Sequence, residues 1–87
     1  MTDDTLLEFP CDFPIKAFGY DTGDFGALVV ELIQGHAPEV THDDMHTRSS
    51  RGGRYLAVTI TVRAVSREQL DGIYHSLSAH ERVLVAL

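Results

Sequence analysis

The chain has 87 residues, of which 44% are hydrophobic and 23% are charged, and its formal net charge is −6. This mixture is ordinary for a globular protein and excludes disorder over most of the length. A domain of this size hides only about 60% of its unfolded surface, which leaves one modest core and no deep active-site cavity. The negative charge works against phosphate backbones and anionic membranes, so we expect neither a nucleic-acid partner nor a membrane partner.

The amino-terminal segment has no features of a targeting signal. The chain opens with Met1-Thr2-Asp3-Asp4, and no apolar run approaches the roughly 18 residues that a membrane span requires. Cys11 is the only cysteine and cannot form an internal disulfide. We therefore expect a cytoplasmic protein in which residues 1–12 form a flexible acidic lead and residues 13–87 form a single domain.

Residues 13–20 have the alternation of a strand. Ile15 and Ala17 share one face with Phe13, while Lys16 and Phe18 share the other face with Tyr20. This pattern predicts the first strand of a sheet.

The next segment has helical spacing. Asp21 or Thr22 can cap its beginning, and Pro38 is expected to end it. Its apolar stripe consists of Phe25, Leu28, Val29, Leu32 and Ile33. His36 falls at the expected carboxyl end, where a cation would offset the helix dipole.

A polar edge strand is predicted over residues 41–47. His42, Asp44 and His46 would share one face with Arg48, which resembles a set of metal ligands. Residues two apart on a strand lie roughly 6.5 to 7 Å apart, so only neighbouring pairs could share an ion. We therefore expect a polar edge and no metal site.

Three arginines then gather in the segment Arg48-Ser49-Ser50-Arg51-Gly52-Gly53-Arg54-Tyr55. Gly52-Gly53 can supply the positive φ angles of a two-residue hairpin turn, and residues 55–62 alternate as the following strand. Guanidinium groups, hydroxyls and turn amides could together bind a carboxylate or a phosphate. The alternative is a solvated hairpin tip. The candidate partner- or anion-binding residues are Arg48, Ser49, Ser50, Arg51, Arg54 and Tyr55.

A second helix and a short last strand complete the chain. Ser66 and Gln69 have the spacing of a capping box, and an apolar stripe follows as far as about His80. Residues 81–87 alternate as a terminal strand.

The element order βαββαβ predicts an α+β, ferredoxin-like sandwich, with a four-stranded antiparallel sheet and two helices on one face. In this topology the first and third strands are central. The face that the helices leave open would then present Lys16, Phe18, Tyr55, Thr59 and Thr61. A face of this kind meets water, a ligand or another chain, and we expect a homodimer through this face or through the edge strand.

Three segments of the chain resemble the YbeD-like family of small uncharacterised bacterial proteins. They are Phe9-Pro10-Cys11-Asp12-Phe13-Pro14-Ile15-Lys16-Ala17-Phe18-Gly19, Gln34-Gly35-His36-Ala37-Pro38, and the arginine segment with its Val-Thr-Ile-Thr-Val continuation. Where that family often has Lys-Gly-Asn at the turn, this chain has Arg51-Gly52-Gly53, which keeps the charge and drops the asparagine. The resemblance implies a fold similar to ACT regulatory domains, no catalytic residues, and an association with lipoate metabolism.

No catalytic arrangement is visible in the residues themselves. Cys11 has no histidine at a useful spacing, and Asp43 and Asp44 would point to opposite faces of a strand. RNA-recognition modules share the βαββαβ topology, but of their stacking aromatics only Tyr55 is present on the third strand. We expect no enzyme activity and no cofactor.

Two functions follow as hypotheses. The first is a regulatory or adaptor module that acts through contacts with an unknown protein partner. The second is an ACT-like sensor that binds a small anionic metabolite at a dimer interface.

Overall fold

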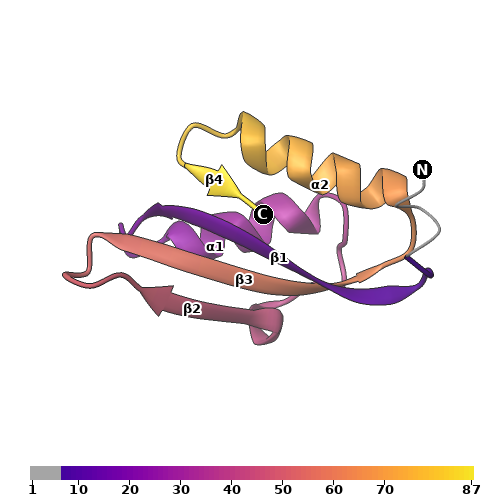
Figure 1. Ribbon diagram of the computed structural model, residues 1–87, viewed down its shortest axis with the longest axis horizontal. Coiled ribbons are helices and arrows are strands. Elements are labelled where there is room, and N and C mark those ends of the chain that lie inside the picture. The colour runs from indigo at the N-terminus through magenta and orange to yellow at the C-terminus, as the bar shows by residue number, and fades with distance from the viewer. Residues whose placement is uncertain (1–6) are drawn as a thin grey trace.

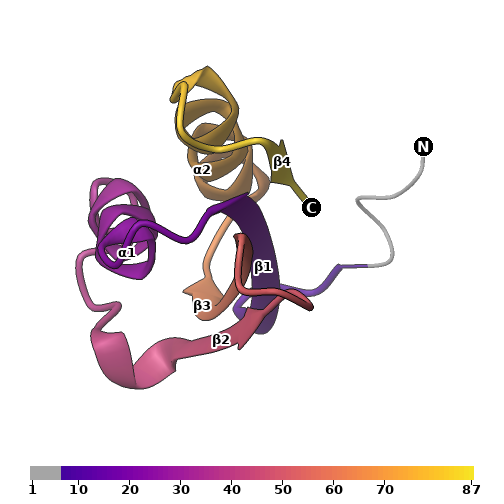
Figure 2. The ribbon, with the colours of Figure 1, turned by 90° about the vertical axis from the view of Figure 1, so that its left-hand side faces the viewer.

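The structure is a computed structural model that describes residues 7–87 (Figure 1). Its elements are β1 (Cys11–Tyr20), α1 (Phe25–Gln34), η2 (His42–Asp44), β2 (Met45–Ser49), β3 (Tyr55–Ala64), α2 (Arg67–Ala79) and β4 (Val85–Ala86). The strands form one antiparallel sheet in the order β2-β3-β1-β4. Both helices lie on the same side of it (Figure 2). The predicted ferredoxin-like fold is confirmed.

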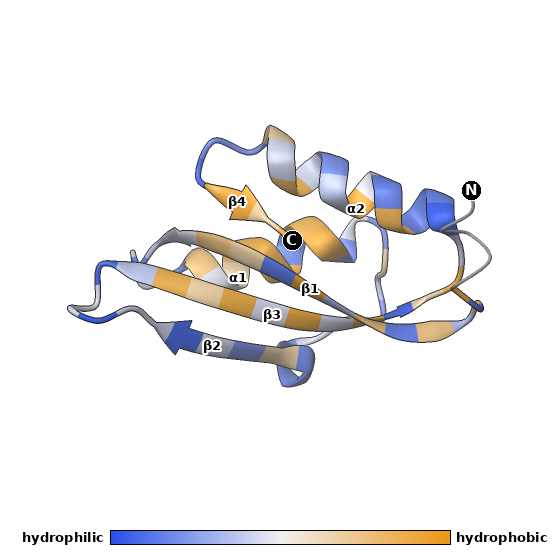
Figure 3. Ribbon diagram, in the orientation of Figure 1, coloured by the Kyte–Doolittle hydropathy of each residue, from blue (hydrophilic) through white to orange (hydrophobic). Residues whose placement is uncertain are grey.

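The core lies between the helices and the two central strands. β1 and β3 pair over ten residues, from Cys11 opposite Ala64 to Tyr20 opposite Tyr55. Ile15 and Ile60 face each other in this ladder and are fully buried. Strict alternation therefore directs one face of each central strand to the helices, as the sequence predicted, and Figure 3 shows the resulting hydrophobic banding along β3.

Helix α1 begins and ends elsewhere than predicted. Its N-cap is Asp24, and neither Asp21 nor Thr22 caps it. It ends at Gln34, well before Pro38, and the amides of His36 and Ala37 both donate to Ile33 O beyond it. His36 therefore lies beyond the helix, and its Nε2 is 2.7 Å from Oγ of Ser76 on α2, so this residue ties the two helices together.

The predicted strand over residues 41–47 is wrong in its first half. Residues 42–44 form a short 3-10 helix, η2, and β2 starts only at Met45. The amide of Asp43 donates to Thr41 Oγ1, and the amide of Thr41 donates to Asp44 Oδ2. These local bonds satisfy backbone groups that a strand would otherwise present for pairing.

The turn between β2 and β3 is longer than the predicted two-residue hairpin. Gly52 and Gly53 have φ angles of +87° and +74°, so the expected need for glycine is confirmed. However, Gly53 N donates to Ser50 O, which places Gly52 at the third position of a β-turn. Four residues, 51–54, separate the closing pair Ser50 and Tyr55.

The two ends of the described chain also differ from expectation. β1 starts at Cys11, two residues before the predicted Phe13, and Leu7 and Phe9 of the expected lead pack against the core. Residues 1–6 of that lead lie outside the described residues. β4 is only two residues long, because a turn in which Val83 N donates to His80 O precedes it.

Helix α2 matches its prediction closely. Ser66 is the N-cap, and its hydroxyl accepts a hydrogen bond from Gln69 N. The side chain of Gln69 reaches back to accept from Val65 N and also donates to His36 O. One glutamine therefore fixes both the start of α2 and the segment that follows α1.

Candidate functional site

The side of the sheet opposite the helices carries most of the predicted site residues, and we call it the open face. The register places Phe18 between Val85 and Ala57, with Arg48 beyond Ala57. A second row places Lys16 beside Thr59, which faces His46. Leu87 exchanges two backbone hydrogen bonds with Lys16, at 2.8 and 2.9 Å, and extends that row. The open face consists of Lys16, Phe18, Tyr20, His46, Arg48, Tyr55, Ala57, Thr59, Thr61, Val85 and Leu87, and the Asp12–Arg63 pair and Pro14 continue it beyond β2.

Unpaired cations gather on the open face and at the hairpin. Arg63 pairs with Asp12, Arg67 with Asp71, and Arg82 with Asp24. The remaining four cations have no ion pair to any residue within 7–87, and they are Lys16, Arg48, Arg51 and Arg54. This region is therefore positive on a chain whose formal net charge is −6.

The structure brings together four of the six residues of the predicted hairpin site, because Arg48, Ser49, Ser50 and Tyr55 line one hollow, which Arg51 and Arg54 do not line. Arg48 lies on the open face, whereas Arg51 and Arg54 lie in the turn. Ser49 alternates with Arg48 on β2, so its side chain points to the side of the sheet that carries the helices, although the residue also lines this hollow. The Ser50 hydroxyl accepts from Tyr55 N at 3.0 Å, which assigns it to closing the hairpin.

Tyr55 also has a structural partner. Its ring stacks on that of Tyr20, with centroids 5.1 Å apart and an interplanar angle of 29°. The backbone amide of Asp21 donates to Arg54 O and joins the end of β1 to the hairpin. These contacts hold the hairpin against β1 and keep both rings at one end of the open face.

Two adjoining hollows share Phe18, Arg48 and Ala57 in their lining. One is lined also by Lys16, His46, Thr47 and Thr59, and the other by Ser49, Ser50 and Tyr55. Of the predicted open-face residues, Lys16, Phe18 and Thr59 are therefore brought together. Thr61 lies outside both hollows, because it pairs with Pro14 at a position that β2, which begins opposite Ile60, does not reach.

The sequence interpretation omitted several members of the open face from the site. Tyr20 lies two residues after Phe18 on β1, so the alternation of this strand alone could have placed it on the open face. The alternation of β3 likewise places Ala57 on the open face. Val85 and Leu87 were not recoverable, because their positions depend on where the turn before β4 ends.

The candidate metal ligands do not share a strand face. His42 lies in η2 and lines a groove beside α1, whereas His46 lies on the open face. The Asp44 carboxylate accepts a hydrogen bond from the amide of Thr41. Over residues 7–87 no group of three His, Cys, Asp or Glu side chains is placed to hold a metal ion.

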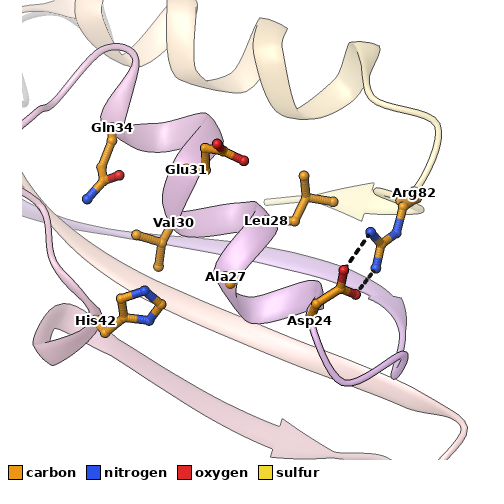
Figure 4. A pocket seen from close by; sticks show the side chains of 8 residues that line it. All are labelled: Asp24, Ala27, Leu28, Val30, Glu31, Gln34, His42 and Arg82. Atoms are coloured by element: carbon orange, nitrogen blue, oxygen red, sulfur yellow. Dashed lines mark hydrogen bonds and ion pairs between the residues drawn. The ribbon is translucent and has the colours of Figure 1, made fainter.

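The groove beside α1 is closed at one end by an ion pair (Figure 4). The Arg82 guanidinium donates to both carboxylate oxygens of Asp24, at 2.6 and 3.4 Å, and also donates to the Thr22 hydroxyl. Hydrogen bonds from Arg82 and Thr22 lower the pKa of Asp24 from 3.8 to about 2. The same pair raises the pKa of Arg82. Because both charges are already matched, this end of the groove offers little to a ligand.

This ion pair predicts a dependence of stability on pH. The lowered pKa of Asp24 means that its contribution is present above pH 3.8 and is lost as the pH falls towards about 2. In Asp24→Asn, we expect the free energy of unfolding to change less between about pH 5 and about pH 2 than in the wild type. Urea denaturation at several pH values measures this difference. Asp21→Asn is the control, and an equal flattening in both variants would contradict the assignment.

No helix within residues 7–87 has the length and apolarity that crossing a bilayer demands.

Comparison with known proteins agrees with the resemblance found in the sequence. A model of a protein family of unknown function, DUF493, matches residues 4–87. A UPF0250 protein of Ralstonia nicotianae is 48% identical over 97% of this chain and 87% of its own length. A UPF0250 protein of Nitrosomonas europaea is 41% identical over the full length of both chains. The predicted membership of the YbeD-like group of uncharacterised bacterial proteins is thus confirmed, and the chain belongs to the DUF493 family.

Proposed function

We propose that this protein is a non-catalytic cytoplasmic adaptor that binds a negatively charged protein partner through its open face. The observation that supports this proposal is the combination of exposed apolar side chains with unpaired cations on one face of the sheet. Each component has a physical reason to favour a protein partner.

The apolar component is concentrated on this face. Tyr20, Tyr55, Val85 and Leu87 are 52%, 39%, 48% and 63% exposed, and they account for most of the large exposed apolar side chains within residues 7–87. Phe18 lies among them and is partly exposed. Aromatic and apolar side chains grouped in this way are typical of the energetic centre of a protein interface.

The unpaired cations of the open face determine which charge the partner must carry. Lys16 and Arg48 flank Phe18 in the two rows of the open face, and neither forms an ion pair with a residue within 7–87. A positive surface on an acidic protein repels copies of the same surface and attracts acidic ones. We infer that the partner presents carboxylates around an apolar contact.

The second candidate function is a sensor of a small anionic metabolite. The two hollows around Phe18 and Arg48 favour it, because they place a cation beside an aromatic ring. A thermal-shift screen of amino acids, short fatty acids and lipoate tests this function. Stabilisation by one compound, lost in Arg48→Ala, would replace the adaptor by the sensor.

Site-specific photo-cross-linking in the native cell tests the adaptor function. A cross-linking residue placed at Thr59 on the open face is expected to form an adduct with a defined protein. The same residue placed at Ser78, which is exposed on α2, is expected to form none. The adduct should also be lost in Lys16→Glu, since the reversed charge repels an acidic partner.

Two results would contradict the adaptor proposal. One is equal cross-linking from Thr59 and Ser78, which would indicate random encounters. The other is an adduct that ribonuclease removes, which would identify RNA as the polyanion.

A further inference from the structure

β2 is an edge strand with a free outer side (Figure 1). Ser50 N donates to Tyr55 O, which identifies Ser50 and Tyr55 as a hydrogen-bonded pair of the β2–β3 ladder. In an antiparallel ladder such pairs alternate, so Arg48 and His46 also direct their backbone groups towards β3. The intervening residues, Thr47 and Ser49, direct theirs outwards.

Nothing in the described chain covers these outward groups. Met45 N is occupied, because it donates to His42 O. No hydrogen bond to a described residue satisfies the N–H or C=O groups of Thr47 and Ser49 on the outer side. β2 also lacks proline, which commonly blocks an edge strand, and carries one formal charge, on Arg48. This edge is therefore available for a further strand.

Negative charges lie before β2 and positive charges lie at and after its end, so two antiparallel copies of this edge would bring opposite charges together. Asp43 and Asp44 precede β2, whereas Arg48 lies near its end and Arg51 lies beyond it. In an antiparallel pairing centred on Thr47, the turn that follows β2 in one copy, with Arg51, comes beside η2 of the other copy, with Asp43. The same register pairs Ser49 with Met45, so the outward-facing residues of one copy meet those of the second.

We propose that two copies of this protein associate by antiparallel pairing of their β2 strands about a two-fold axis at Thr47. The two sheets then form one continuous sheet, and each copy contributes an Arg51–Asp43 contact. A parallel pairing would place like charges side by side and is disfavoured. Association through the open faces is disfavoured also, because it would bring Lys16 and Arg48 of both copies together.

This arrangement leaves the open face uncovered. Both open faces lie on the same side of the joined sheet, so an acidic partner with two binding segments could engage both copies. The pairing does not rest on the proposed adaptor function, because its groups lie on the edge strand and at its two ends. Either proposal can fail without the other.

Charge exchange between the two copies tests the pairing. The wild type is expected to form a dimer that dissociates on dilution, measured by sedimentation velocity. Asp43→Arg alone places two arginines at each contact, and Arg51→Asp alone places two aspartates there. Each is expected to weaken dimerisation about tenfold. An equimolar mixture of the two variants restores both contacts, and we expect it to dimerise at least as tightly as the wild type.

Two further variants make the test decisive. Thr47→Pro removes an outward-facing N–H that the β2–β3 ladder does not use, so the variant should fold and remain monomeric. Glu68→Arg, on exposed α2, should leave the dimer unchanged. A wild type that stays monomeric at every concentration, or a mixture no tighter than the single variants, would overturn the proposal.

Discussion

Replacing Gly19 with alanine is expected to lower the free energy of unfolding by about 2 to 3 kcal/mol, at the upper end of what overpacking a core costs. A Cβ at this position would lie 2.5 Å from two ring carbons of Phe25 and 2.7 Å from the backbone oxygen of Arg82. Phe25 is 1% exposed, so its ring has no free space into which it can move. Gly19 is thus the point at which β1, α1 and the turn before β4 meet.

Chemical denaturation measures this effect directly. Gly35→Ala is the matched control, because Gly35 has an ordinary helical φ of −61° and an added Cβ comes no closer than 3.4 Å to its nearest neighbour. That variant should be neutral or slightly stabilising, since alanine restricts the unfolded chain. If both glycine variants lose the same free energy, the close approach at Gly19 is not the cause.

The elements predicted well from sequence are those in which a side-chain period and burial agree. β1 and β3 alternate strictly because one face of each packs on the helices. Helix α2 matched because Ser66 and Gln69 carry local capping chemistry that is readable without tertiary contacts. In these cases local preference and global packing favour the same conformation.

The errors arose where local hydrogen bonds compete with the expected element. The Thr41 hydroxyl accepts from Asp43 N and the Asp44 carboxylate accepts from Thr41 N, and these bonds favour a 3-10 helix over residues 42–44, which the alternation of polar residues did not reveal. The sequence of residues 41–47 does alternate, but neither face of this segment is buried, so packing does not require an extended strand. An edge with both sides polar specifies its conformation weakly.

In the candidate site, too, the residues placed by a local strand pattern were predicted and those placed by tertiary hydrogen bonds were not. The parity of β1 and β3 placed Lys16, Phe18 and Thr59 on one face correctly. Their neighbours Val85 and Leu87 depend on the hydrogen bonds that set the register of β4 against β1, and no local pattern encodes those bonds. The hairpin arginines were recognised as a group, yet only Arg48 belongs to the open face.

Charge reversal on the open face is expected to have the largest effect on function. In the double variant Lys16→Glu with Arg48→Glu, binding to the protein captured from Thr59 should weaken by at least about a hundredfold, because two charge-assisted contacts become repulsive. Both side chains are exposed and lack ion pairs within residues 7–87, so stability should change little. Titration of the purified partner against each variant measures the affinity, and denaturation verifies the fold.

The control is the double variant Arg63→Glu with Arg67→Glu, which makes the chain equally more negative than its formal −6. Arg63 lies at the far end of β3, opposite Asp12, and Arg67 lies on α2, so neither flanks Phe18. If net charge alone governed association, the two double variants would lose affinity equally. A loss confined to Lys16 and Arg48 would instead locate recognition at the two rows around Phe18, where an acidic partner can satisfy both cations and cover the exposed ring in one contact.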